Sequence, residues 1–306
     1  MIHDRISSTI NSKKKLTLQL EKSKNEQKKF QLCYFQQQNQ KRKLSTMTFQ
    51  TYLINLDRAT DRLAWMQKNF EAEQIAFERI EAVDARVLAA DSYQIHNKFS
   101  RELLLPEVGC FLSHVKTLQT FLRSNHQFAL VMEDDAILLP GFKLAVGNSI
   151  AQRSSLPNEH QWDVLKLYNG RHHHIKIADI DDKHFLAACG LSIPITTIAA
   201  IWTREAAEKF LAKVVQSKPI VKRPIDCELQ HPWEYGLRIY NLLPSLCHGD
   251  TKWESSVRVS RPKKNLPMNL AYEINRFFPK ILYLIRHHGL GQFIHSFVLK
   301  KNKWLQ

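Results

Sequence analysis

The sequence has few cysteines, and none of them are paired at the spacing of a metal-binding or redox motif. The five are scattered along the chain: Cys33, Cys110, Cys189, Cys227 and Cys247. A disulfide framework or a zinc site is therefore not expected, and a reducing compartment is favoured. The chain also lacks an apolar run of about 18 residues, and its first ten residues lack the apolar core of a signal peptide. We therefore expect a cytoplasmic protein without a transmembrane segment.

Acidic residues are scarce at both ends of the chain. Of the net charge of +15, residues 1–48 contribute +8 and residues 258–306 contribute +9, which leaves −2 for the middle. A nucleic-acid enzyme usually carries its positive charge on the domain that contacts phosphates. The neutral middle thus argues against nucleic acid as a partner, and a nucleic-acid-binding protein is the less favoured alternative. The basic ends suit an anionic membrane surface or serve as solvated tails.

The distribution of charge divides the chain into three parts. Residues 1–48 are rich in Lys, Gln, Ser and Asn and have no clear period, which predicts a basic, mobile or weakly helical extension. Residues 49–257 have the apolar patterns of a folded domain. Residues 258–306 form a basic tail in which apolar and cationic residues alternate at helical spacing.

Apolar runs alternate with helical patterns between residues 49 and 257. We predict helices over residues 60–72, 108–122 and 204–215, and strands over residues 49–56, 77–83, 128–132, 162–168 and 198–202. This alternation predicts an α/β fold with a mixed, mostly parallel sheet flanked by helices. Because ligands bind outside the carboxyl ends of such strands, the loop after Asn55 and the turn at residues 133–135 are expected in one site.

Three consecutive carboxylates, Glu133, Asp134 and Asp135, follow the strand predicted over residues 128–132. Their mutual repulsion is relieved by a cation or by solvent. Mg²⁺ or Mn²⁺ suits the triplet, because a hard ion takes few protein carboxylates and completes its shell with water and phosphate oxygens. In an extended turn the first and third carboxylates project to one side and the second to the other. A solvated acidic turn is the alternative.

Five segments in order resemble one family. They are YLINLDRATDR (52–62), VGCFLSH (108–114), LVMEDDAIL (130–138), PIDCEL (224–229) and LPSLCH with SSV (243–248 and 255–257). Together they resemble glycosyltransferase family 25, the bacterial lipooligosaccharide galactosyltransferase type, over about residues 50–257. The resemblance implies a GT-A-type fold, a nucleotide-sugar donor, usually UDP-galactose, and inverting transfer to a glycan acceptor. UDP-glucose and UDP-N-acetylhexosamine are the alternative donors.

The resemblance also implies where the donor binds. Arginines suit a diphosphate because they form forked, charge-assisted hydrogen bonds. A solvated helix-face charge is the alternative for Arg62, and a core histidine is the alternative for His114. The donor-binding positions that the resemblance implies are Asn55, Leu56, Arg58, Arg62, Gly109, Ser113, His114, Glu133 and Asp134.

The resemblance also implies, by position, which residues ligate the metal and which acts as the base. Asp135 is expected to ligate the metal, and His248 either completes the metal shell or forms a hydrogen bond nearby. Inverting transfer needs a base that takes the proton of the acceptor hydroxyl, opposite the leaving diphosphate. Asp226 is the first candidate and Glu228 the second, with a helix N-cap as the alternative for Asp226.

Two segments depart from the family pattern or lie outside it. Residues 197–202 (TIAAIW) stand where the family shows a G-x-x-Y-like pattern, so the sugar preference is left open. The run of histidines at residues 172–174 matches no family motif, and an exposed loop is favoured over metal binding.

The basic tail predicts two amphipathic helices broken near Gly289 and Gly291. Helices that are both basic and aromatic lie well on anionic bilayers. We therefore expect peripheral contact with the inner face of the cytoplasmic membrane, where a lipid-linked oligosaccharide acceptor would be presented. The alternative is that the apolar faces of the tail pack on the catalytic domain.

Overall fold

The computed structural model describes residues 49–170, 174–189, 195–250 and 266–298. The chain divides into two units, Met1–Met47 and Thr48–Gln306, and all described residues belong to the second. The extension predicted over residues 1–48 and most of the histidine run (171–173 are not described) thus lie outside the described residues.

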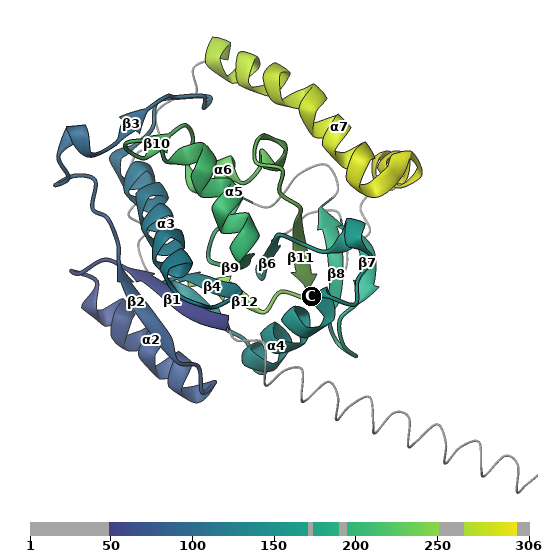
Figure 1. The fold of residues 1–306 in the computed structure, drawn as a ribbon, viewed down its shortest axis with the longest axis horizontal. Coiled ribbons are helices and arrows are strands. Elements are labelled where there is room, and N and C mark those ends of the chain that lie inside the picture. The colour runs from purple at the N-terminus through teal and green to yellow at the C-terminus, as the bar shows by residue number, and fades with distance from the viewer. Residues whose placement is uncertain (1–48, 171–173, 190–194, 251–265, 299–306) are drawn as a thin grey trace, which may run out of the picture. The chain divides into compact units, whose positions relative to one another are not determined.

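An eight-stranded sheet forms the centre of the second unit (Figure 1). Its strands are β1 (Phe49–Asn55), β2 (Phe77–Glu81), β4 (Phe128–Glu133), β6 (Val164–Lys166), β7 (His174–Asp179), β8 (Phe185–Cys189), β9 (Ala199–Thr203) and β11 (Ile239–Leu243). They are arranged in the order β2-β1-β4-β9-β6-β11-β8-β7. Two further pairs join β3 (Gln94–Ile95) to β10 (Ile220–Val221) and β5 (Ala136–Leu138) to β12 (Cys247–Gly249).

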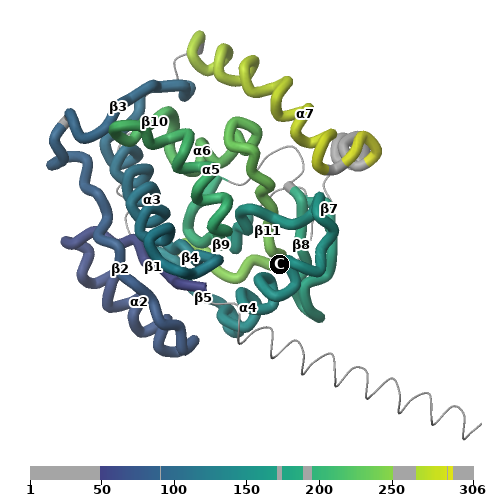
Figure 2. The backbone as a smooth tube through the Cα atoms, viewed as in Figure 1, coloured from purple at the N-terminus to yellow at the C-terminus, as the bar shows by residue number. Residues whose placement is uncertain are grey.

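Helices cover this sheet, and α7 runs along the edge of the unit, drawn in yellow (Figure 2). The α-helices are α2 (Thr60–Ala72), α3 (Leu105–Arg123), α4 (Phe142–Arg153), α5 (Arg204–Val214), α6 (Ile225–Glu228) and α7 (Leu266–Val298). Short 3₁₀ turns are η1 (Ala90–Ser92), η2 (Asn158–His160) and η3 (Pro232–Glu234). The predicted α/β class, with helices flanking a sheet, is confirmed.

Helix α3 packs at the centre of the core, as its apolar period predicts. Phe111, Val115 and Leu118 are buried, and Phe111 meets Phe210 of α5 with ring centroids 6.2 Å apart. The helix begins three residues before the predicted start. Glu107 explains this, because its carboxylate accepts a hydrogen bond of 2.9 Å from the backbone N–H of Leu104 and closes the first turn.

The sheet is mixed, as predicted, but the prediction that it is mostly parallel is wrong. β1 pairs in parallel with β2 and β4, and β6 with β11. The pairs β4–β9, β6–β9, β8–β11 and β7–β8 are antiparallel. Continuous apolar runs predicted parallel strands, but any strand covered on both faces has such a run, whatever the direction of its neighbours. The sheet is mixed, and the GT-A assignment stays a prediction.

The C-terminal tail is helical and interrupted where the sequence predicts. Gly289 has φ 77°, a left-handed conformation that breaks α7 into two helices. One face of α7 packs on the sheet domain: the Tyr283 hydroxyl donates to the Leu237 carbonyl (3.0 Å) and accepts from the Ile239 N–H (3.3 Å). The packing alternative is therefore confirmed for this face. Within the described ranges, no helix is long and apolar enough to cross a bilayer.

Candidate functional site

The acidic triplet lies at the carboxyl edge of two neighbouring parallel strands. Glu133 ends β4 beside Ile54 of β1, and Asn55 ends β1. The Asn55 side-chain amide donates a hydrogen bond of 2.7 Å to an oxygen of Asp134. Asn55 and the triplet therefore lie together at this sheet edge, as predicted, and donor binding there stays a prediction.

Asp134 is held from two sides. It accepts from Asn55 through one oxygen and forms an ion pair of 2.9 Å with Arg62 through the other. Arg79 in turn donates to the Asn55 side-chain oxygen at 3.0 Å. Burial raises the pKa of Asp134, and the charge of Arg62 opposes this shift. Arg62 is therefore not a solvated helix-face charge, and the contact of Asp134 with a donor sugar stays a prediction.

Glu133 faces helix α3. Its carboxylate accepts a hydrogen bond of 2.5 Å from the Thr197 hydroxyl and contacts His114 Nε2 at 3.2 Å and Cys110 Sγ at 3.9 Å. Burial works to raise the pKa of Glu133, but the hydrogen bonds from His114 and Thr197 outweigh it and the pKa is lowered. Glu133 is thus an anion at neutral pH. His114 is 2% exposed, with Nε2 on Glu133 and Nδ1 without a partner among the described residues, so it matches the alternative of a core histidine with one satisfied nitrogen, and its contact with a donor stays a prediction.

Asp135 has an oxygen without a partner. Its Oδ1 is buried and receives no hydrogen bond from the described residues. Burial, reinforced by the charges of Glu133 and Asp134, raises the pKa of Asp135 to about 7. An unpartnered buried carboxylate oxygen beside two like charges is the environment that a divalent cation relieves. The residue present at this position therefore fits the predicted metal.

The strand that carries His248 lies beside the triplet. β12 pairs with β5, which places His248 opposite Ile137, and the N–H of Asp250 donates to the Asp135 carbonyl at 2.8 Å. Among the described residues, three metal-capable side chains within 4.8 Å of one another are found at Cys110, His114 and Glu133, and not at Asp135. A cation at Asp135 would complete its shell with water and donor phosphates. Ligation by His248 stays a prediction.

Asp226 is within electrostatic reach of the triplet. Burial raises its pKa, as does the charge of Glu133, while the charge of Lys166 lowers it. Besides burial, the charges of Glu133, Asp226 and Asp135 all raise the pKa of the Cys110 thiol. Of these three carboxylates, that of Glu133 contacts the thiol, at 3.9 Å, and the role of Asp226 as a base stays a prediction.

The structure corrects two predictions about α6. Pro224 occupies the N-cap position, and Asp226 lies inside the first turn with its Oδ1 accepting from the Cys227 N–H at 2.7 Å. Asp226 is therefore not the helix cap. Glu228 is fully buried, ion-paired with Arg223 at 2.7 Å and bonded to the Tyr235 hydroxyl. Glu228 as a second candidate base is wrong, because no acceptor hydroxyl can reach it.

Gly109 and Ser113 hold α3 against the segment after β2. A Cβ atom at Gly109 would lie 2.5 Å from the Val83 carbonyl oxygen. The Ser113 hydroxyl accepts from the Val83 N–H (2.8 Å) and donates to the Gly109 carbonyl (2.7 Å). Both residues thus have a structural role next to the site, and direct donor contact stays a prediction.

The loop after β1 carries the two remaining predicted donor contacts. The Leu56 carbonyl accepts from the Ala59 N–H at 2.8 Å and closes the turn before α2. Arg58 is half exposed and ion-paired with Asp84. Hydrogen bonds from Arg86, with the help of Arg58, hold the pKa of Asp84 far below its usual value. Binding of the diphosphate by Arg58 requires this pair to open.

Sequence reasoning missed Lys166 and Thr197. Lys166 is buried at 1% exposure in β6, and a lone lysine inside the apolar run WDVLKLY was the signal for a charge with a function. Thr197 lies in the segment that departs from the family pattern, and no motif pointed to its hydrogen bond with Glu133.

Carboxylates at the strand ends of a mixed α/β sheet, with the buried ammonium group of Lys166 in the same sheet, are expected in an enzyme that binds a phosphate-bearing donor. The comparison with protein families agrees. The model described as "Glycosyltransferase family 25 (LPS biosynthesis protein)" matches residues 47–226. The chain belongs to glycosyltransferase family 25.

Curated relatives carry the same family name. A glycosyltransferase 25 family member of Anopheles gambiae is 27% identical over 82% of this chain and 45% of its own length. Procollagen galactosyltransferase 1 of Danio rerio is 30% identical over 40% of this chain and 21% of its own. A probable inactive glycosyltransferase 25 family member 3 of Bos taurus is 27% identical over 70% of this chain and 39% of its own. The chain thus spans less than half the length of these relatives.

Proposed function

We propose that the protein is an inverting hexosyltransferase that moves galactose from UDP-galactose to a hydroxyl of a glycan acceptor. The observation that carries the proposal is the unpartnered, buried Oδ1 of Asp135 at the sheet edge where Asn55 meets the triplet. Family membership supports glycosyl transfer. The galactosyltransferase name of the zebrafish relative supports the sugar.

The residues fit a divalent metal, Mn²⁺ or Mg²⁺. Asp135 would hold the ion, with His248 as a further ligand. Glu133 would contact the ribose of the donor or a metal-bound water. When bound, such an ion neutralises the negative charge that develops on the leaving diphosphate. A GT-A-type fold, which the mixed sheet is compatible with, belongs to this proposal.

Asp226 is the proposed catalytic base. An inverting transfer needs one carboxylate to take the acceptor proton and needs no protein nucleophile. Burial raises the pKa of Asp226 above that of a free aspartate, which strengthens it as a base, and the charge of Lys166 favours its ionised form. Asn55 and Arg62 orient Asp134 so that the turn keeps its geometry around the donor.

The acceptor is proposed to be a lipid-linked oligosaccharide of the lipooligosaccharide type. The description of the matching family as an LPS biosynthesis protein supports this class. UDP-glucose and UDP-N-acetylhexosamine remain the alternative donors, because residues 197–202 differ from the family pattern next to Glu133.

A nucleotide-sugar panel tests the proposal. Released nucleotide is measured with Mn²⁺ or with a chelator, for wild type, Asp135→Ala and the exposed control Asp91→Asn. We expect UDP-galactose to be turned over with Mn²⁺ only, by wild type and Asp91→Asn. Turnover by Asp135→Ala at the wild-type rate would refute the metal assignment. An absence of turnover with every donor and metal would indicate a silent member, as the bovine relative is named.

The outer face of α7 supports association with an anionic membrane. Side chains at helical spacing on this face are more than half exposed: Leu270, Ile274, Phe277, Phe278 and Leu282. The opposite face carries the buried Tyr272 and Tyr283, so the exposed stripe is unpartnered within the described residues. Residues 258–306 carry +9, which complements anionic headgroups. We propose that this stripe lies on the inner face of the cytoplasmic membrane.

Vesicle flotation tests the membrane proposal. We expect the protein to float with phosphatidylglycerol vesicles and not with phosphatidylcholine vesicles, and added salt to weaken binding. The double variant Ile274→Ser and Phe278→Ser should lose flotation. The control Val87→Ser and Leu144→Ser replaces exposed apolar residues elsewhere and should retain it. Equal flotation of both variants would exclude the stripe as the membrane contact.

A further inference from the structure

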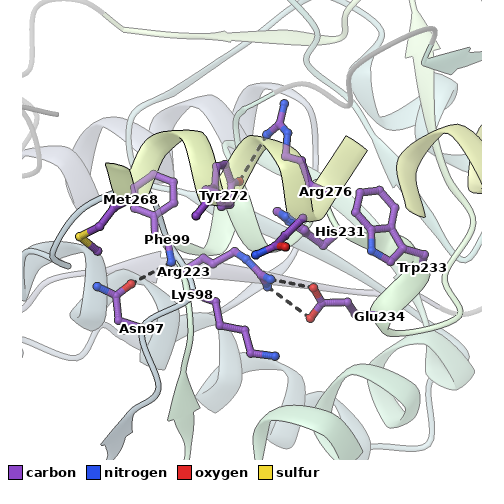
Figure 3. Close-up of a pocket in the computed structure, with 12 residues that line it drawn as sticks. Asn97, Lys98, Phe99, Arg223, His231, Trp233, Glu234, Met268, Tyr272 and Arg276 are labelled. Carbon is purple, nitrogen blue, oxygen red and sulfur yellow. Dashed lines mark hydrogen bonds and ion pairs between the residues drawn. The ribbon is translucent and has the colours of Figure 1, made fainter. Parts of the chain in front are cut away.

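A pocket of about 530 Å³ lies between α7 and the segments around β3 and η3. Figure 3 shows Tyr272 and Arg276 on the α7 side and the Arg223–Glu234 pair on the other. None of the predicted site residues lines it. Its walls are formed by Asn97, Lys98, Phe99, Arg223, His231, Trp233, Glu234, Met268, Ala271, Tyr272, Asn275 and Arg276.

Aromatic rings form a continuous apolar wall of the pocket. The ring of Tyr272 lies 5.5 Å from those of Phe99 and His231, and His231 lies 5.1 Å from Trp233. Burial above all lowers the pKa of His231 to about 4, so this ring is neutral. Neutral aromatic faces bury C–H surface of a ligand without having to give up a charge.

The charged groups of the pocket compensate one another. Arg223 is ion-paired with Glu228 and Glu234, and Arg276 with Glu273. These three carboxylates balance Arg223, Arg276 and the exposed Lys98. The pocket therefore has no excess positive charge that would select a phosphate or another anion.

Polar groups are nevertheless present for a ligand rich in hydroxyls. Arg223 is 4% exposed, and its Nε is buried without a hydrogen-bond partner among the described residues. Asn97, Asn275 and Glu234 add amides and a carboxylate to the lining. A saccharide matches this combination, because its ring has an apolar C–H face and a rim of hydroxyls that donate and accept.

The pocket and the proposed transfer centre share segments of the chain. Arg223, which lines the pocket, precedes Asp226 by three residues, on the other side of Pro224. Phe99 lies under the guanidinium of Arg101 at 5.0 Å, and Arg101 forms a two-pronged ion pair with Glu107 of α3. One wall of the pocket is thus tied to the segments that carry the proposed base and the helix behind the triplet.

We infer that the pocket beneath α7 is a second saccharide site, which binds neutral sugars of the acceptor at a distance from the hydroxyl that reacts. The inference rests on the proposed function for its ligand class. It gives α7 a role in selecting the acceptor, because Ala271, Tyr272 and Asn275 supply one wall.

Binding to an array of neutral and acidic oligosaccharides tests the inference without any transfer reaction. Labelled full-length wild type, Trp233→Ala and Ala271→Trp are compared. The first variant removes an aromatic face, and the second fills the pocket from an exposed position on the helix. We expect wild type to bind neutral glycans and both variants to bind them about tenfold more weakly. Trp65→Ala, at an exposed position on helix α2, should bind as wild type does.

Several outcomes would overturn the inference: no glycan bound by wild type, binding confined to acidic glycans, or full binding by Ala271→Trp with an unchanged melting temperature. Since Ala271 is exposed, this variant remains informative if Trp233→Ala fails to fold. Failure of the proposed function is seen separately. Wild type would then bind neutral glycans through the pocket and turn over no nucleotide sugar.

Discussion

Two carboxylates of α6 show how strongly the surroundings decide the role of a residue. Asp226 shares its environment with Glu133 and Lys166, whereas Glu228 is enclosed between Arg223 and Tyr235. Both stand in the segment PIDCEL, and the sequence offers no means of separating them. The two roles differ because the side chain of Glu228 lies in the core, whereas that of Asp226 is within electrostatic reach of Glu133.

Glu228→Gln is expected to destabilise the fold. The change removes the buried partner of Arg223 and leaves it only the half-buried Glu234, at a cost of about 3 kcal/mol. Denaturant unfolding should show this loss, while Glu234→Gln, whose carboxylate is partly exposed, should cost less. Equal midpoints for wild type and Glu228→Gln would show that the pair contributes nothing to stability.

Asp135→Asn is expected to stabilise the metal-free protein above pH 7. The pKa of Asp135 is raised from 3.8 to about 7 in the folded state, so the folded chain keeps a proton that the unfolded chain has released. This contribution to stability is present below about pH 4 and is lost as the pH rises through 7. The variant removes that loss, because its amide does not ionise.

Melting temperatures of wild type and Asp135→Asn between pH 4 and pH 8, with a chelator present, measure the effect. The two curves should diverge as the pH rises, with the variant higher at pH 8. When Mn²⁺ replaces the chelator, the melting temperature should rise for wild type only. Parallel curves across this range would contradict the pKa assigned to Asp135.

At the scale of elements, sequence periodicity predicted individual helices and strands well and their neighbours poorly. The helix over residues 60–72 was predicted with its observed bounds, because the apolar residues of an amphipathic helix fix its face and length. The direction of β9 between β4 and β6 was not predictable, since a strand buried on both faces has the same composition in either direction. Short pieces such as β5 and β12 carry too few residues for any period.

Gly109→Ala is expected to loosen α3 from the segment after β2. The added Cβ would lie 2.5 Å from the Val83 carbonyl oxygen, a backbone atom that cannot move aside cheaply. We expect a loss of about 1–3 kcal/mol in the free energy of unfolding, more than alanine gains from its helix propensity. Gly170→Ala, which meets its nearest neighbour at 3.8 Å, is the control. A variant as stable as wild type would show that α3 can shift without cost.

At the scale of the whole described unit, the site is assembled from segments far apart in the chain. The proposed site draws on the loop after β1, helix α3, the triplet, α6 and β12. The order of motifs implied such a site through the family resemblance, and the hydrogen bond from Asn55 to Asp134 shows that two of these segments meet. Lys166 and the pocket beneath α7 depend on tertiary packing that no local pattern encodes.

The two faces of α7 have different surroundings. The inner face, with Tyr272 and Tyr283, packs on the domain and lines the pocket, and the outer face is apolar and exposed. The sequence offered membrane contact and domain packing as alternatives. One helix can pack on the domain and also meet a membrane, because opposite stripes of an amphipathic helix face different surroundings.

The most direct test of the central claim is product formation from UDP-galactose by Asp226→Asn, with donor binding measured by calorimetry on the same preparation. Loss of a general base should lower the rate of transfer by about 10²–10⁴-fold. Donor affinity should stay close to that of wild type, because a base that takes the acceptor proton is proposed to lie on the acceptor side, away from the leaving diphosphate. Transfer by Asp226→Asn at the wild-type rate would contradict the assignment of the base and, with it, the proposed transfer centre.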